Sequence, residues 1–461
     1  MHEADEILKN IKRVHFVGIG GSGICPIAEI LHSRGYIITG SDNNEGDTLD
    51  RMTALGIKTY LGHDAKNVGD AEAVIYSAAI PASNPELVWA RENNIPTLER
   101  SKAFGALTRD YKHCIGICGT HGKTTTSAML TQVLIEAQVN PSALIGGKLK
   151  YTGTNGIVGS DELFVCEACE FNNTFLELSP TCAVILNIDA DHLEFFKTMD
   201  NLKSSFTKFA AMAQTVIYNG DDENTVDAVK KLQDKTLVSF GFGENVDWRA
   251  DNITVHDGAY YEFDVIKSGE KRARVKLAVP GRHNIYNALA CMAASDNEGV
   301  GPGITAPLIS DFTGAGRRFE KLGEFDGVTI ADDYAHHPTE LEATLTAAKQ
   351  MSYKRVIAVF QPYTFSRTSM HLEWFARVLK IADMVILTPI MGGREINTWG
   401  VKSEDLAALL DNCTICETFR DVADYAESIA ESGDLIITLG CGDIYKAAKL
   451  MVKDYREKHD K

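Results

Sequence analysis

Two glycine-rich loops in the sequence have the residue types that phosphate binding requires. The stronger one, Gly119-Thr120-His121-Gly122-Lys123-Thr124-Thr125, joins a β-branched run to a helical pattern. In such a strand–loop–helix, backbone N–H groups and the helix dipole cradle phosphates, the lysine reaches the β- and γ-phosphates, and the threonine hydroxyl ligates Mg²⁺. The loop is shorter than in most P-loops, because Ile117 stands where the first glycine is expected. We predict an ATP site here; a glycine turn without ligand is the alternative.

An acid and a histidine follow the next strand-like runs. Glu167 follows the run 163–166, and Asp189, Asp191 and His192 follow the run 183–188. If these runs flank the strand that ends at Gly119, all of these side chains emerge at the carboxyl edge of one sheet, where ligands bind. Thr124 and Glu167 then offer the oxygen ligands that Mg²⁺ prefers. His192 is a further candidate ligand, although a lone histidine is more often structural.

The other loop, Gly18-Ile19-Gly20-Gly21-Ser22-Gly23, matches the G-x-G-x-x-G pattern of dinucleotide-binding folds. It follows the strand-like run Val14–Val17, opens a helical stretch (27–31), and has Asp42 at the end of the next strand. This context suits a pyrophosphate at a helix N-terminus and an acid on a ribose. Taken alone, the loop indicates an NAD-dependent dehydrogenase, or else a glycine turn that packs a helix on a strand.

Composition excludes several classes of function. The net charge of −17 argues against sequence-independent binding to nucleic acid or to an anionic membrane surface. No run is apolar enough to span a bilayer, and the acidic N-terminus is not a signal peptide. We expect a cytoplasmic protein with reduced thiols, either a monomer or a weak homodimer. The pairs Cys166–Cys169 and Cys413–Cys416 lie in or beside strand-like runs, so we interpret them as buried apolar residues, not zinc ligands.

The elements that must position these residues alternate between short β-branched runs and helical patterns, which is typical of α/β folds with parallel sheets. A third series of strand-like runs, at 328–331, 355–360, 384–388 and 434–439, follows the glycine-rich stretch 312–316. We therefore predict three domains: a Rossmann-like domain at 1–110, a central P-loop ATPase-like parallel sheet at 111–317, and a Rossmann-like α/β domain at 318–461.

Taken together, the motifs resemble those of the Mur ligases, and they span nearly the whole chain. The matching segments, in family order, are GTHGKTT at 119–125, Glu167 in EACE, NIDADH at 187–192, PGRHNIYN at 280–287, Arg317–Phe319 and DDYAHH at 332–337. The resemblance implies ATP- and Mg²⁺-dependent ligation of a carboxylate to an amine through an acyl phosphate. It further implies UDP-N-acetylmuramate and L-alanine as substrates, in the synthesis of peptidoglycan precursors.

The resemblance also implies the roles of individual residues. UDP-sugar binding would fall to Gly18, Gly20, Gly21, Ser22, Gly23, Ser41, Asp42 and His63. ATP binding would fall to Gly119–Thr125, His283, Asn284, Asn287, Arg317 and Asp333, and metal binding to Thr124, Glu167 and His192. The amino-acid site would contain Tyr334, His336 and Arg367. The groups in the reaction itself would be Lys123, Glu167, His192, His336 and Arg367, with His336 or His192 as the base.

Departures from the family pattern and rival functions remain open at this point. Tyr363 and Thr364 stand where many relatives have His and Arg, and Cys169 stands where an acid is common, with Glu170 beside it. The nearest rival is a recycling ligase that attaches a ready-made tripeptide to the same sugar nucleotide. An NAD-dependent oxidoreductase would leave the loop at Gly119 without a function, and a non-enzymatic ATP-binding regulator would not need Glu167 or His192.

Overall fold

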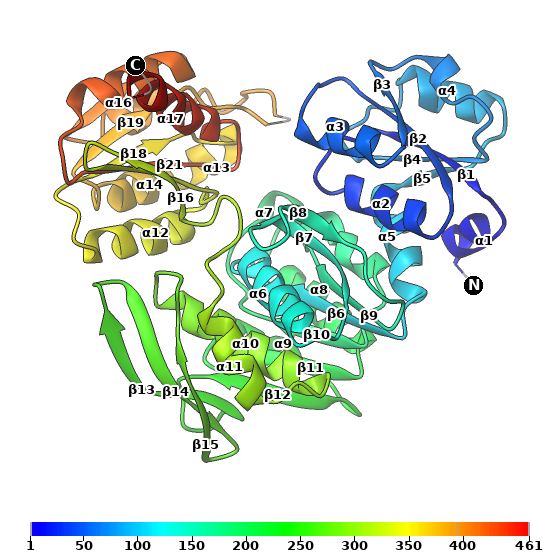
Figure 1. The fold of residues 1–461 in the computed structure, drawn as a ribbon, viewed down its shortest axis with the longest axis horizontal. Helices are drawn as coiled ribbons and strands as arrows, with labels where there is room; N and C mark the ends of the chain where they lie inside the picture. Colours follow the sequence, from blue (N-terminus) through cyan, green and yellow to red (C-terminus); the bar gives the residue numbers. More distant parts are fainter. Residues whose placement is uncertain (1, 394, 460–461) are drawn as a thin grey trace. The chain divides into compact units, whose positions relative to one another are not determined.

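The computed structural model describes residues 2–393 and 395–459, which form sheets of five, ten and six strands (Figure 1). These residues group into two compact units. Of the described residues, one unit contains 2–251, 264–274 and 286–309, and the other contains 252–263, 275–285, 310–393 and 395–459. Each unit is α/β, as the alternating sequence pattern predicts. No helix in the described ranges has the length and apolar character that crossing a membrane requires.

The N-terminal sheet has the order β3-β2-β1-β4-β5, and every pair of neighbouring strands is parallel. Its strands are β1 (Arg13–Val17), β2 (Ile37–Asp42), β3 (Lys58–Leu61), β4 (Ala73–Tyr76) and β5 (Thr97–Glu99). Its helices are α1 (Glu3–Lys9), α2 (Cys25–Ser33), α3 (Asp47–Ala54), η1 (Ala65–Asn67), α4 (Pro85–Glu92) and α5 (Arg100–Arg109). This is the Rossmann-like order that the first glycine loop predicts, with that loop at the end of the central strand.

The central sheet has the order β15-β14-β13-β12-β11-β10-β6-β9-β7-β8. Its strands are β6 (His113–Cys118), β7 (Ser142–Leu149), β8 (Thr154–Ile157), β9 (Leu163–Glu167), β10 (Cys182–Ile185), β11 (Thr215–Asn219), β12 (Thr236–Gly241), β13 (Trp248–His256), β14 (Tyr260–Lys267) and β15 (Glu270–Lys276). Its helices are α6 (Lys123–Glu136), η2 (Phe171–Glu177), α7 (Leu193–Phe196), α8 (Met199–Met212), α9 (Glu223–Val229), α10 (His283–Asn297) and α11 (Pro302–Ser310). Strand β6 pairs in parallel with both β9 and β10, which confirms the predicted neighbours of the phosphate loop. Strand β8 joins antiparallel to β7, so this sheet is mixed and not purely parallel.

The C-terminal sheet has the order β16-β17-β21-β18-β19-β20, with the edge strand β16 antiparallel and the other strands parallel. Its strands are β16 (Glu320–Phe325), β17 (Val328–Asp333), β18 (Val356–Phe360), β19 (Met384–Leu387), β20 (Cys413–Ile415) and β21 (Leu435–Leu439). Its helices are α12 (Pro338–Gln350), α13 (Phe365–Met370), α14 (Leu372–Leu379), α15 (Ser403–Ala407), α16 (Phe419–Ile429) and α17 (Tyr445–His459). Helices α12 and α14 cover one face, and α16 and α17 cover the other (Figure 1).

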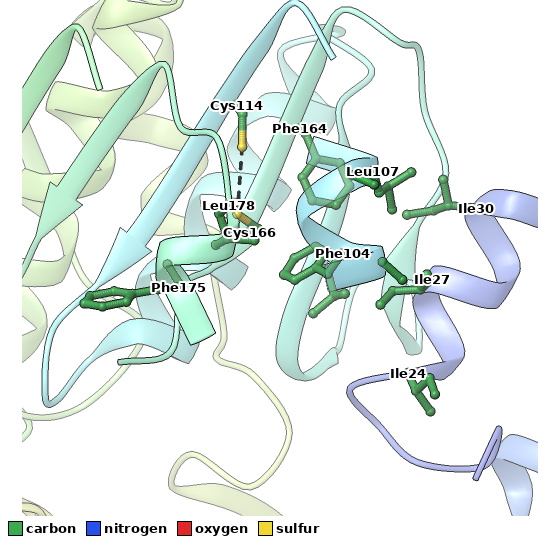
Figure 2. Close-up of a cluster of buried hydrophobic side chains, with 14 of the residues drawn as sticks. Ile24, Ile27, Ile30, Phe104, Leu107, Cys114, Phe164, Cys166, Phe175 and Leu178 are labelled. Carbon is green, nitrogen blue, oxygen red and sulfur yellow. Dashed lines mark hydrogen bonds between the residues drawn. The ribbon is translucent and has the colours of Figure 1, made fainter. Parts of the chain in front are cut away.

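An aromatic core joins α2 and α5 to the central sheet within the first unit (Figure 2). Phe164 of β9 is fully buried, and its ring centre lies 5.9 Å from that of Phe104 and 4.8 Å from that of Tyr111. Cys166 of the same strand is buried with its Sγ 3.9 Å from that of Cys114, as its interpretation as an apolar residue predicts. Cys169, by contrast, is exposed, so the same interpretation was wrong for that residue.

Phe164→Ala should destabilise the protein by about 3–5 kcal/mol, because it removes a buried ring and leaves a cavity between α5 and β9. Chemical denaturation monitored by circular dichroism measures this change. Tyr151→Ala is the matched control, since Tyr151 is 55% exposed. This substitution should lower the free energy of unfolding by less than about 0.5 kcal/mol. Equal losses for the two variants would contradict the placement of Phe164 in the core.

Candidate functional site

The loop between β6 and α6 has a backbone that only glycine fits at two positions. Gly119 has φ +138° and Gly122 has φ +88°. A Cβ on Gly119 would lie 3.0 Å from the side chain of Leu186, and one on Gly122 would lie 2.6 Å from Asn287 Oδ1. Helix α6 begins at Lys123, directly after the second of these glycines. A glycine loop that leads straight into a helix N-terminus is the arrangement in which backbone N–H groups bind an anion.

The segment after β10 braces this loop. The side chain of Asn187 accepts from the N–H of His121 at 2.8 Å and donates to the same residue's carbonyl at 3.0 Å. Its backbone carbonyl accepts from the N–H of Thr120 at 3.0 Å, and the Thr120 hydroxyl accepts from the N–H of Asp189 at 2.9 Å. The loop is consequently held in shape by a neighbouring strand end. The sequence motif at 187–192 does not reveal this second function.

Lys123 lies at the centre of the loop in a buried ion pair with Glu170. Its Nζ is 3.0 Å from a carboxylate oxygen of Glu170, and it also donates to the carbonyls of Gly119 and Thr120. Burial by itself lowers the pKa of Lys123, but the charges of Glu170, Cys169 and Glu167 together outweigh burial and raise it. Lys123 is therefore a fixed positive charge at the phosphate loop.

Thr124 and Glu167 meet beside this charge, as predicted for a metal pair. The Thr124 hydroxyl donates to Glu167 Oε2 at 2.8 Å, and the N–H of Gly146 donates to the same oxygen at 2.9 Å. A Cβ on Gly146 would lie 2.3 Å from Glu167 Oε2, so a side chain there would displace this carboxylate oxygen. A hydroxyl and a carboxylate in contact form a donor set that fits Mg²⁺.

Three further residues predicted to bind the metal or ATP have other surroundings. His192 caps α7 with φ +55°, and its ring lies 4.9 Å from that of Phe171 and its Nε2 3.7 Å from Asp191. Asn287 accepts from the Thr126 hydroxyl at 3.2 Å, so it lies against the phosphate loop. Asn284 is the second residue of α10, which begins at His283, and its amide donates to the carbonyl of Pro280 at 2.7 Å.

At the first glycine loop, the end of β2 faces the loop backbone. The N–H groups of Gly18 and Ile19 both donate to the carbonyl of Ser41, and the N–H of Gly20 donates to Asp42 Oδ2 at 2.9 Å. A Cβ on Gly20 would lie 2.9 Å from this carboxylate oxygen. The predicted members Gly18, Gly20, Ser41 and Asp42 are thus brought together.

A buried carboxylate that the sequence analysis missed lies behind this loop. Glu86, at the start of α4, accepts from the Ser41 hydroxyl at 2.6 Å, from Asn67 Nδ2 at 2.8 Å and from His63 Nδ1 at 3.1 Å. Burial raises its pKa, but contacts with His15, Ser41 and Asn67 prevail and lower the pKa to about 2. Glu86 therefore fixes two predicted sugar-nucleotide residues, Ser41 and His63.

In the second unit, Arg317 and Asp333 are bound to the backbone and side chains around them. Arg317 donates from Nε to Asp332 at 2.8 Å and from a terminal nitrogen to the carbonyl of Gly440 at 2.6 Å. Asp333 is buried and accepts from the N–H of Phe319 at 2.7 Å. Burial raises the pKa of Asp333 to about 6. These contacts fix the ends of β17 and β21 against each other.

The predicted amino-acid residues gather near a half-buried thiol, Cys441, that the sequence analysis did not single out. The rings of Tyr334 and His336 are edge to face with centres 5.6 Å apart. Burial, together with the neighbouring Cys441, raises the pKa of Tyr334 to about 12. Burial also raises the pKa of Cys441 to about 12, while the charge of Arg367 opposes this shift. Arg367, in α13, is therefore within electrostatic range of the same thiol.

Comparison with known proteins places these features in one family. The sequence profiles described as "Mur ligase family, catalytic domain", "Mur ligase middle domain" and "Mur ligase, glutamate ligase domain" match residues 13–112, 117–295 and 317–442. The UDP-N-acetylmuramate–L-alanine ligase of Caldicellulosiruptor bescii is 43% identical over 451 residues, which cover 96% of this chain and 99% of that protein. The ligase of the same name from Clostridium novyi is 42% identical, with 96% and 98% covered.

Solved structures agree with this comparison. The UDP-N-acetylmuramate–alanine ligase of Thermotoga maritima superposes with a TM-score of 0.83 at 29% identity, covering 97% of this chain and 99% of that chain. A murein peptide ligase from Psychrobacter arcticus superposes with a TM-score of 0.75 at 22% identity, covering 96% and 98%, which shows a common fold.

The lowered pKa of Glu86 predicts an acid-sensitive contribution to stability. A pKa that falls from 4.5 to about 2 on folding is worth roughly 3 kcal/mol. Because the folded pKa is depressed, this stability is present above the unfolded pKa and is lost as the pH falls through the folded value. The free energy of unfolding of Glu86→Gln, measured against pH, should lie below the parent's at neutral pH and approach it near pH 2. Glu92→Gln, an exposed change on the same helix, is the control. If the difference in free energy of unfolding between Glu86→Gln and the parent does not vary with pH, Glu86 is not charged in the folded protein.

Proposed function

The chain belongs to the Mur ligase family, and we propose that it joins L-alanine to UDP-N-acetylmuramate through an acyl phosphate formed with ATP. The observation that carries this proposal is the carboxyl edge around β6. There a glycine loop, the ammonium group of Lys123 and the Thr124–Glu167 oxygen pair meet. The identity of 43% to a UDP-N-acetylmuramate–L-alanine ligase, over nearly the full length of both chains, supports this choice of substrates.

The three sheets divide the substrates among them. We assign the sugar nucleotide to residues 1–110, ATP to 111–317 and the amino acid to 318–461. The loop Gly18–Gly23 would hold the pyrophosphate on its backbone, with Asp42 beside it and His63 near the uridine. An NAD-dependent oxidoreductase would use only this first site, and it would not need the ATP-binding residues at β6.

The activation step must bring two anions together. A carboxylate is a poor electrophile, because its oxygen cannot leave until phosphorylation turns it into a phosphate leaving group. The carboxylate and the γ-phosphate repel each other, and Lys123 and the N–H groups at the start of α6 would stabilise the charge that builds up between them. Glu170 keeps Lys123 charged and in place before the nucleotide arrives.

Magnesium, held by Thr124 and Glu167 with His192 as a further ligand, would supply positive charge to the phosphate oxygens. Asn187 contributes by holding the loop backbone, so that its N–H groups remain directed at the phosphates. Water must be kept away from the acyl phosphate until the amine attacks.

Lys123→Ala should lower kcat by about a thousandfold or more with the fold intact, because the fixed positive charge at the transferred phosphoryl group is lost. Phosphate release from ATP, measured with UDP-N-acetylmuramate and each amine in turn, tests this change and the proposed function together. The parent should turn over with L-alanine, and Lys231→Ala, an exposed lysine, should match the parent. Turnover only with a preformed tripeptide would favour the recycling ligase. Near-normal turnover by folded Lys123→Ala would exclude the proposed ATP site.

Glu167→Gln and His192→Ala should each raise the magnesium concentration needed for half-maximal activity, because each removes a proposed ligand. The measurement is initial rate against magnesium concentration at saturating ATP. Glu223→Gln, an exposed change on α9, should leave the curve unchanged. Curves for Glu167→Gln and His192→Ala that overlay the parent's would exclude these residues from the metal site.

A further inference from the structure

A histidine and a glutamate in the second unit are arranged as a proton acceptor and its charged partner. His336 lies just before α12, and Glu340 lies in the first turn of that helix. The Nδ1 atom of His336 is 3.1 Å from Glu340 Oε2 and also 3.1 Å from the carbonyl oxygen of Tyr334. The two side chains are 19% and 15% exposed, so the pair is sheltered but reachable.

The carbonyl contact determines which nitrogen of His336 carries the proton. A carbonyl oxygen can only accept a hydrogen bond, so the Nδ1 atom must donate. With the proton on Nδ1, the Nε2 atom of the neutral ring carries the lone pair and is able to accept a proton. The carboxylate of Glu340 lies 3.1 Å from Nδ1, and its negative charge stabilises the ring after it becomes cationic.

Glu340 is itself held rigidly. The same Oε2 atom accepts from the backbone N–H of His336 at 3.1 Å and from that of His337 at 3.4 Å, as part of the capping box of α12. The start of the helix thereby fixes the carboxylate 3.1 Å from the imidazole, while the hydrogen bond to the Tyr334 carbonyl orients the ring. A base needs such fixed neighbours.

The proposed function requires a base. The amino acid arrives as an ammonium ion, which has no lone pair, and it cannot attack the acyl phosphate until one proton is removed. We propose that His336 Nε2 takes this proton, and that Glu340 is the positioning residue whose charge stabilises the protonated ring. This inference rests on the proposed function and goes beyond it by choosing His336 over His192 as the base and by naming Glu340 as its partner.

The proton balance of the step is complete. The ammonium group gives one proton to Nε2, and the neutral amine attacks the acyl carbon to form the C–N bond. The C–O bond to phosphate then breaks, and the departing phosphate takes the second proton from nitrogen. The His336 imidazolium releases its proton to water, so that one proton is released overall for each amide formed.

Several ionisable groups surround this pair: Arg317 and Arg318 lie over the ring of Tyr334, and Tyr363 also acts on it electrostatically. Tyr334 lies on the chain before His336, and Cys441 follows β21. Arg367 of α13 and Glu340 both act electrostatically on that thiol. The positive charge of Arg367 suits the carboxylate of the incoming amino acid, while the negative charge of Glu340 suits its ammonium group.

The test uses two nucleophiles that differ in their need for a base. Hydroxylamine is neutral at neutral pH and traps an acyl phosphate as a hydroxamate, whereas L-alanine must first lose a proton. His336→Gln and Glu340→Gln should lower kcat for L-alanine by about a hundredfold or more. Both variants should form hydroxamate from UDP-N-acetylmuramate and ATP at rates within a few-fold of the parent. The deficit with L-alanine should shrink as the pH rises and the free amino acid loses its proton in solution.

A second histidine–glutamate pair in this unit provides matched controls. His256 Nε2 lies 2.8 Å from Glu262 Oε2 on the strands β13 and β14, so His256→Gln and Glu262→Gln should behave like the parent with both nucleophiles. If His336→Gln loses both products, or neither, His336 is not the base. If Glu340→Gln loses both products and also its helical circular dichroism, its role is only to cap α12. A parent that forms neither product would instead refute the proposed function.

Discussion

The parallel pairing of strands around β6, β1 and β21 is the constraint on which the rest of the structure depends. Neighbouring parallel strands end at the same edge of a sheet, so the loops that follow them lie close together. At β6 this brings the loop at Gly119 beside Glu167 of β9 and Asn187 after β10. In the second unit it brings Asp333 of β17 beside Gly440 after β21. The pairing of the strands alone therefore places each proposed substrate site at the edge of a sheet.

Buried charges are then held at these edges by complete sets of partners. Taking a carboxylate or an ammonium group out of water costs several kcal/mol unless hydrogen bonds and an opposite charge compensate. Lys123 is compensated by Glu170 and two carbonyls, and Glu86 by Ser41, His63 and Asn67. Such groups cannot reorient cheaply. In the proposed reaction, these charges would therefore already be in place when the substrates arrive.

Sequence patterns predict the loops and strands well, because each is encoded by neighbouring residues. The glycines at 119 and 122, the β-branched run before them and Glu167 at a strand end are local signals, and the fold confirms their placement. Glu86 has no such signal, since it is one acid in a Pro–Glu helix start whose partners come from three other elements. Asn284 shows the opposite case. It is predicted to bind ATP, but in the structure its side-chain amide donates a hydrogen bond to the carbonyl of Pro280, four residues earlier. Tertiary hydrogen bonds of this kind cannot be read from spacing.

In the proposed reaction, one oxygen of the sugar carboxylate leaves with the phosphate. UDP-N-acetylmuramate labelled with a heavy oxygen isotope in its carboxylate tests this directly, by mass spectrometry of the phosphate released during ligation of L-alanine. If an acyl phosphate forms, each released phosphate should contain one labelled oxygen. Phosphate that carries no label, while the amide still forms, would contradict an acyl phosphate and with it the proposed chemistry of the site at β6.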